Sequence, residues 1–359
     1  MAGRNQKKYR EYRGRRSGSA SVMKVIVVIL AILLAAALLF TLFLGKYVEY
    51  TDEGVRLRLP WGQEEPKEPE EPIHSDTLVV ETPEPTAQPT AEPAPEAAPV
   101  LTAVEVTAAQ LANGTAADAV KQAGGNCLVV EMKNEYGRVN WPTKVKNTIG
   151  LPTSVADAAA KELKELAESG ELYLVARVNC FRDQTLANAG RGGPLLTYSG
   201  KVWYDRDGMR WVSPASDDVR TYLTALCTEL AELGFDEVLL ECAGYPYYGE
   251  IHALATDDLR PEELSQPVEA FWREVRTALA ARDVKLSFLV TGDMITGADE
   301  YSGINPSVLA RYAERVWTKA GEADYAALLT EAGMEFAAER LVYIGGSEGS
   351  TAMMEGPAD

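Results

Sequence analysis

The sequence predicts an α/β protein whose main domain is a (β/α)8 TIM-type barrel beginning near residue 100. Two observations lead to this prediction. Short apolar runs alternate with longer amphipathic stretches, and such alternation is typical of a parallel sheet covered by helices. The 260 residues from 100 to 359 are the usual size of one such barrel. An open doubly wound sheet is the alternative, but no glycine-rich turn follows the first apolar run.

A basic tail and a long apolar run begin the chain. Residues 1–24 contain eight Lys or Arg and one acidic residue, and residues 25–44 contain no charge. A helix of that length is ~30 Å long, enough to cross the hydrocarbon of a bilayer. A cleaved signal peptide, the alternative, has an apolar region of only ~7–15 residues. We therefore expect a cytoplasmic tail followed by a transmembrane signal anchor, because basic residues favour the cytoplasmic side.

Two further segments separate this span from the barrel. Residues 46–61 alternate apolar and polar on both sides of a polar turn at 52–54, which predicts a juxtamembrane hairpin. Residues 62–99 contain nine prolines and ten acidic residues. That segment has too few apolar groups to fold, and its like charges keep it extended, so we expect a disordered linker. The expected location is the cell membrane, in a single pass with the barrel outside the cytoplasm.

Within the barrel, residues 100–344, the apolar runs predict strands at 101–106, 127–132, 172–178, 238–242, 286–290, 315–318 and 341–344. Amphipathic stretches predict helices at 115–123, 154–169, 216–233, 261–281, 306–314 and 322–332. Ser216 precedes two acidic residues, as is typical of a helix start, and Gly234 follows the last turn of that helix. The eighth strand is expected to be absent or irregular, and residues 345–359 are expected to be a disordered tail.

Composition excludes several classes of function. The net charge is −18, which argues against nucleic acid as a partner because its binding needs basic surface. The chain has two histidines, and its four cysteines form no C-x-x-C pair. No metal site is therefore expected, and buried free thiols are favoured over disulfides. No P-loop or nucleophile elbow occurs, and we expect no cofactor.

Charged residues end four of the predicted strands. Glu131, Arg177, Glu241 and Asp293 lie at or near the ends of apolar runs. In a barrel these ends meet at one mouth, where functional groups lie. Two facing carboxylates can hydrolyse a glycosidic bond, one as acid and the other as nucleophile or base. We expect Glu241 and Asp293 to be the catalytic pair, in an order left open, with Glu131 and Arg177 binding substrate and tuning their charge; a structural role is the alternative for each.

Further substrate contacts are expected from the loops beyond these strands. Asp183 follows the third strand, Trp203 lies in the long loop after it, and Tyr245 follows the fourth strand. Aromatic rings beside a polar cleft are a usual surface for stacking sugars. The alternative is that the rings pack the loops down as a lid. The partner that this pattern predicts is a carbohydrate.

Three stretches resemble a known family. They are residues 129–139, residues 176–183, and residues 211–214 taken with Tyr222 and residues 234–238. Residues 101 to about 318 are similar to the glycoside hydrolase domain family of bacterial surface proteins, an α-amylase-like (β/α)8 group. The resemblance implies a barrel that acts on a glycan. In this divergent member, Gly244 stands where the family has an arginine, and Asn134 stands where an acid is usual.

Two functions therefore stay open. The first is a membrane-anchored, extracytoplasmic glycoside hydrolase that acts on an envelope or extracellular glycan. The second is a catalytically inactive barrel that binds glycans or scaffolds the envelope, and the two departures from the family pattern favour it. The geometry of the carboxylates separates the two, because a catalytic pair must face one substrate.

Overall fold

The computed structural model describes residues 48–51, 54–57, 100–146, 148–150, 153–189, 192–256 and 259–357. The chain divides into two units, Met1–Pro89 and Thr90–Asp359. In the first, β1 (Val48–Thr51) pairs antiparallel with β2 (Gly54–Leu57), inside the range where a hairpin is expected. The basic tail, the apolar span at 25–44 and the linker at 62–99 lie outside the described residues. Within the described ranges, no helix has the length and apolar character needed to span a bilayer.

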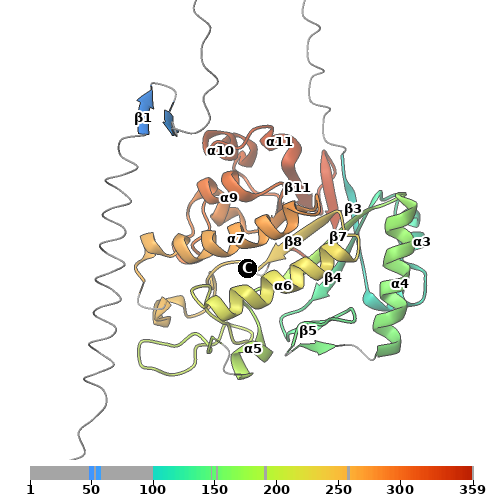
Figure 1. Ribbon diagram of the computed structural model, residues 1–359, viewed down its shortest axis with the longest axis horizontal. Helices are drawn as coiled ribbons and strands as arrows, with labels where there is room; N and C mark the ends of the chain where they lie inside the picture. Colours follow the sequence, from blue (N-terminus) through green and yellow to red (C-terminus); the bar gives the residue numbers. More distant parts are fainter. Residues whose placement is uncertain are drawn as a thin grey trace, which may run out of the picture. The chain divides into compact units, whose positions relative to one another are not determined.

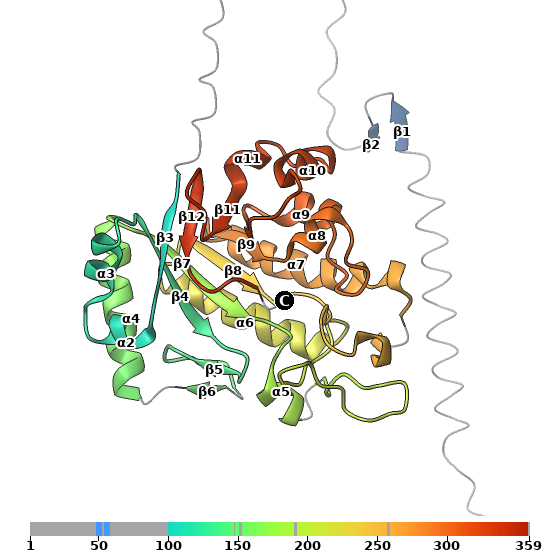
Figure 2. The ribbon, with the colours of Figure 1, turned by 180° about the vertical axis from the view of Figure 1, so that it is seen from behind.

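The second unit contains a closed barrel of eight parallel strands. Around the barrel the order is β3 (Thr102–Val106), β4 (Cys127–Lys133), β7 (Tyr173–Asn179), β8 (Glu237–Glu241), β9 (Lys285–Leu289), β10 (Val316–Lys319), β11 (Leu341–Ile344) and β12 (Ser350–Met353). β12 pairs with β3 and thereby closes the cylinder; the two strands lie side by side in Figure 2. The seven strands expected from the apolar runs are confirmed.

The expectation for the C-terminal part was wrong. Residues 345–359 were expected to be a disordered tail, but they contain β12, the eighth strand. This strand has only four residues, and its apolar pattern is weak. It is held instead by pairing with β11 on one side and β3 on the other. Thr351 donates its backbone N–H to the Leu101 carbonyl at 2.8 Å, and Ser350 Oγ accepts from Leu101 N at 3.1 Å.

Helices cover the outside of the barrel (Figure 1). The described helices are α2 (Ala108–Ala112), α3 (Ala116–Gln122), α4 (Thr153–Ser169), α5 (Gln184–Ala189), α6 (Asp217–Glu232), α7 (Ser265–Ala280), α8 (Gly292–Thr296), α9 (Pro306–Tyr312), α10 (Tyr325–Glu331) and α11 (Ala337–Arg340), with 3-10 turns η1 (Ile251–Ala253) and η3 (Pro261–Glu263). The short strands β5 (Arg138–Val139) and β6 (Ile149–Gly150) extend the sheet beyond β4. Residues 345–349, between β11 and β12, contain no helix.

Capping and packing explain two of the long covering helices, α6 and α7. Ser216 caps α6 by accepting a hydrogen bond from Val219 N at 3.4 Å, and acidic residues fill the first turn. The helix is followed by Gly234 at φ +95°, a backbone conformation that glycine adopts without strain. α7 lies beside α6 (Figure 1) and buries Trp272, whose ring stacks on Phe288 of β9 at 3.5 Å between centroids. These contacts seal the outer face of the central strands.

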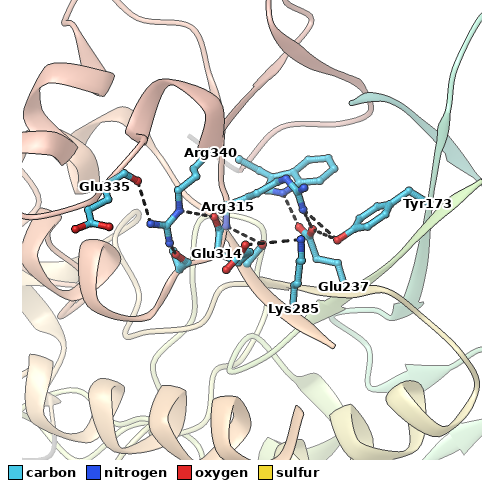
Figure 3. A network of polar contacts seen from close by, with 10 residues as sticks. Tyr173, Glu237, Lys285, Glu314, Arg315, Glu335 and Arg340 are labelled. Carbon is cyan, nitrogen blue, oxygen red and sulfur yellow. Dashed lines mark hydrogen bonds and ion pairs between the residues drawn. The ribbon is translucent and has the colours of Figure 1, made fainter. Parts of the chain in front are cut away.

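The barrel interior is built from alternate residues of each strand, because successive side chains of a strand point to opposite faces. Its apolar layer consists of Leu101, Ala103, Cys127, Val129, Val175, Leu239, Leu289, Trp317, Val342 and Ala352. Toward the N-terminal ends of the strands lies a buried polar group, Glu237 with Arg315 (Figure 3). Glu237 also accepts hydrogen bonds from Tyr173 Oη at 3.0 Å and from Trp317 Nε1 at 3.1 Å. Its charge is therefore fully partnered.

Candidate functional site

The interior faces of four strands end in charged residues. Glu105, Arg177 and Glu241 each stand two positions after an apolar interior residue, and so does Glu131 on β4. The period of two places all four side chains inside the barrel at its C-terminal end. They line a cavity of about 440 Å³, here called the carboxylate cavity. Its other lining residues are Asn134, Glu135, Asn179, Arg182, Glu355 and Gly356.

Arg177 connects two of the acids that line this cavity. Its Nε and Nη2 atoms lie 2.9 and 2.8 Å from Oε2 of Glu241, and Nη1 lies 2.7 Å from Oε1 of Glu105. Arg177 and Glu241 are less than a tenth exposed. Burial raises the pKa of Glu241, while the guanidinium of Arg177 opposes that shift. Arg177 thus couples two of the interior carboxylates, and its charge favours the ionised form of Glu241.

Glu131 has a different environment. Within the described ranges its carboxylate forms no hydrogen bond and no ion pair with the protein. Burial raises its pKa to about 7; nearby Arg177 works against the shift, and the charges of Glu135 and Glu241 add to it. The strand is irregular at this point, since the register between β4 and β7 shifts between Glu131 and Lys133. Bulges of this kind re-aim side chains and are frequent beside active sites.

A buried ion pair lies next to Asn179, which lines this cavity. Lys133 Nζ lies 2.7 Å from Oδ2 of Asp183 and donates to the carbonyl of Asn179 at 2.7 Å. Asp183 Oδ1 accepts from Leu186 N at 2.8 Å. Asp183 is fully buried and does not line any cavity described here, although we expected it to bind substrate. Its contacts instead connect β4 to the start of α5.

Arg182 reaches the carboxylate cavity from the loop after β7 and is held by a second set of acids. Its Nε donates to Oδ2 of Asp205 at 2.7 Å, and Nη2 donates to Asp207 at 2.8 Å. Asp205 also accepts from Trp211 Nε1 at 2.9 Å and Tyr248 Oη at 3.1 Å. Burial favours the neutral acid, but the hydrogen bonds from Arg182 and Trp211 outweigh it and lower the pKa of Asp205. Asp205 thereby fixes the position of Arg182.

Asp293 lies in another cavity. It is exposed in the first turn of α8 and lines a space of about 580 Å³, here called the tyrosine cavity. The polar and aromatic residues of this cavity are Tyr247, Tyr248, Thr291, Asp293, Thr296, Asp299, Glu300, Tyr301, Glu322 and Tyr325. The two acids expected as a catalytic pair, Glu241 and Asp293, therefore line different cavities.

Two aromatic residues expected at the site have buried side chains. Trp203 is 2 % exposed and donates from Nε1 to the Glu250 carbonyl at 3.0 Å. Tyr245 is fully buried, and its backbone N–H donates to Ser302 O at 2.9 Å. Neither ring lines a cavity described here. The same backbone contact explains Gly244, because a Cβ there would stand only 2.4 Å from Ser302 O. An arginine at this position requires a different path of the loop.

Seven lining residues of the carboxylate cavity were not among the predicted site residues: Asn134, Glu135, Asn179, Gly356, Arg182, Glu105 and Glu355. The last belongs to the segment after β12, which runs toward the ends of the central strands in Figure 2. Its backbone N–H lies 3.4 Å from Oε2 of Glu105. Glu105 stands two residues after Ala103, an interior residue of β3, and this alternation in the sequence would have been enough to predict its position. Among the described residues, no group of three His, Cys, Asp or Glu is placed to hold a metal ion.

The solved structures that are similar to this chain include three of low sequence identity. A hypothetical protein from Ruminiclostridium thermocellum is 20 % identical (52 % of this chain, 96 % of that one, TM-score 0.43). The PgaB (BpsB) glycoside hydrolase domain from Bordetella bronchiseptica is 12 % identical (68 % and 84 %, TM-score 0.49). A GH20 exo-β-N-acetylglucosaminidase from Vibrio harveyi is 9 % identical (68 % and 41 %, TM-score 0.43).

No curated protein matches the chain. A family model does match, and the match begins where the described barrel begins. It covers residues 100–314, which is more than half of the chain and includes the strands that carry Glu105, Glu131, Arg177 and Glu241. The chain belongs to the family described as "Putative glycosyl hydrolase domain".

Proposed function

We propose that this protein is a glycoside hydrolase in which Glu131 and Glu241 form the catalytic carboxylate pair. The observation that carries the proposal is the carboxylate cavity, where an unpaired acid with a pKa of about 7 stands close to a carboxylate paired with Arg177. Both acids come from strand ends at the mouth of a barrel, the usual position of catalytic groups in this fold. This pair replaces the one expected from the sequence, in which Asp293 was the partner of Glu241.

The two environments suit different roles. An acid with a pKa near the working pH is partly protonated and can give its proton to the leaving oxygen of a glycosidic bond. Glu131 fits that role. Glu241, whose charged form is stabilised by Arg177, fits the role of nucleophile or of base toward water. Arg177 orients Glu241, and Arg177 and Arg182 both line the cavity in which sugar hydroxyl groups bind.

Substitution of Glu131 tests this assignment. The full-length protein is screened for reducing-end release from cell-wall and storage glycans, and the best glycan is used for variants. Glu131→Gln keeps the shape of the side chain but cannot donate the proton, so turnover falls by about 10²–10⁴-fold with binding retained. Glu339→Gln is the control, because it removes an exposed charge that lines none of the described cavities. Equal turnover by Glu131→Gln and the wild type contradicts the role of Glu131.

A catalytically inactive glycan-binding barrel is the second candidate. The observation that favours it is the ion-pair set around Arg177, which holds Glu105 and Glu241 in place without substrate. A protein of this kind binds a glycan and releases no product. The same screen separates the candidates when it is scored for both binding and product release.

We further propose that the barrel lies outside the cytoplasm, attached to the cell membrane by residues 25–44. The support is the uncharged run of 20 residues preceded by eight basic ones. Protease added to intact cells is expected to remove the barrel, residues 100–359, and to spare the N-terminal tail. Opening the cells is the control, since the tail then becomes accessible. Protection of the barrel in intact cells contradicts this topology.

A further inference from the structure

The carboxylate cavity has an excess of negative charge that the protein does not balance. Its lining includes five glutamates and two arginines. Arg177 is already paired with Glu105 and Glu241, and Arg182 with two aspartates outside the lining. Within the described residues, Glu135 and Glu355 form no ion pair. A ligand that enters this cavity therefore meets uncompensated carboxylates and arginines whose charges are already satisfied.

The tyrosine cavity also has an excess of acidic residues. Asp293, Asp299, Glu300 and Glu322 line it, and no Lys, Arg or His is among its lining residues. Oδ1 of Asp299 accepts from the backbone N–H of Tyr301 at 2.9 Å. Its Oδ2 is buried and has no hydrogen-bond partner in the described part of the chain. Four tyrosines complete the lining, and their ring faces favour a positive charge or a sugar ring over an anion.

We propose that the glycan bound at this mouth carries free ammonium groups, as an oligosaccharide of non-acylated amino sugars does. This inference rests on the proposed function and names its substrate class. An ammonium group donates charge-assisted hydrogen bonds to carboxylates. A uronic acid or phosphorylated sugar is repelled by both cavities. The tyrosine cavity acts as a flanking subsite that holds one amino sugar of the chain.

A metal ion is a poorer occupant than a saccharide. The two cavities measure about 440 and 580 Å³, which is the size range of ligand pockets. Across the described ranges, no group of three His, Cys, Asp or Glu is placed to hold a metal ion. Tyrosine rings also add a contact surface that a small inorganic ion does not use. Size, ligand geometry and lining together favour an extended organic cation.

Binding of matched oligosaccharides to the full-length protein tests the inference. The probes are glucosamine, N-acetylglucosamine and galacturonic acid oligomers of equal length, measured by calorimetry. The glucosamine oligomer is expected to bind at least about tenfold more tightly than the N-acetylated one, and the galacturonic acid oligomer weakest of all. The preference is expected to shrink as salt is raised, because exposed charges are screened. Equal or tighter binding of the N-acetylated oligomer overturns the inference.

A double variant tests the tyrosine cavity itself. Glu300→Gln with Glu322→Gln removes two exposed charges outside the proposed catalytic machinery, and affinity for the glucosamine oligomer is expected to fall by about 2- to 30-fold. Affinity for the N-acetylated oligomer stays unchanged. The matched control is Glu331→Gln with Glu339→Gln, two exposed acids that line none of the described cavities. An equal loss of affinity for the glucosamine oligomer in both double variants contradicts the proposed subsite.

Product release is scored separately, so the two proposals fail in different ways. If the glucosamine oligomer binds and no glycan is cleaved, the proposed hydrolase activity is contradicted and the proposed class of ligand is supported. Cleavage confined to a neutral or anionic glycan keeps the hydrolase and overturns the ligand class.

Discussion

Arg177 separates the two proposed catalytic acids by their electrostatic environment. It contacts Glu241 through two nitrogens and leaves Glu131 without a direct ion pair. The desolvation of Glu131 is therefore only partly offset by the charge of Arg177, and its pKa rises to about 7. A single arginine side chain thus gives two glutamates in one cavity different proton affinities.

The raised pKa of Glu131 predicts a pH-dependent cost to folding. The folded protein binds this proton more tightly than the unfolded chain, so stability falls as pH rises from about 4.5 to 7. In Glu131→Gln this side chain no longer binds a proton, so its contribution to the pH dependence of stability is lost. In urea unfolding, the variant should match the wild type near pH 4 and gain at most ~3 kcal/mol relative to it above pH 7. A stability difference that does not change with pH contradicts the raised pKa.

The sequence was sufficient to identify some site residues and not others. Glu131, Arg177 and Glu241 were predictable because each follows an apolar run and keeps the inward alternation of its strand. Trp203 and Tyr245 were not, because only the path of the loops decides whether a ring lines a cavity or packs beneath it. The backbone contact of Tyr245 with residue 302 joins segments that no local pattern connects.

Among the elements, a strand was predictable when its own residues formed an apolar or alternating pattern. The seven longer apolar runs became strands, because alternating buried positions are visible in the chain itself. β12 had no such signal, since its stability comes from two neighbouring strands, β3 and β11. The short helices α2, α5, α8 and α11 were also missed, since each has only four to six residues.

The closing strand gives a prediction at this scale. Thr351→Pro removes the N–H that bonds to the Leu101 carbonyl and places a proline in a strand paired on both sides. Proline in such a position removes a ladder hydrogen bond and leaves the Leu101 carbonyl without this donor, which is expected to lower the free energy of unfolding by about 1–3 kcal/mol in urea unfolding. Thr351→Val is the control, because it keeps the N–H and suits a strand. A proline variant as stable as the valine variant would mean that β12 does not close the barrel.

At the scale of the whole molecule, barrel closure assembles the site. Glu105 and Glu355 lie 250 positions apart in the chain, yet both line the carboxylate cavity. Parallel strands place all their C-terminal ends on one side, so a shared mouth was predictable. Its division into separate cavities was not. Asp293 follows the strand next to that of Glu241, but α8 begins at Gly292 and places it in the tyrosine cavity.

The central claim is that glycan hydrolysis takes place at the mouth of this barrel and depends on Glu241. The most direct measurement is the rate of reducing-end release by Glu241→Gln, compared with the wild type on one glycan that the wild type cleaves. The proposed mechanism predicts a loss of at least about 10²-fold, with folding and glycan binding nearly intact, because the amide keeps the shape and loses the charge. Full activity of Glu241→Gln contradicts the mechanism.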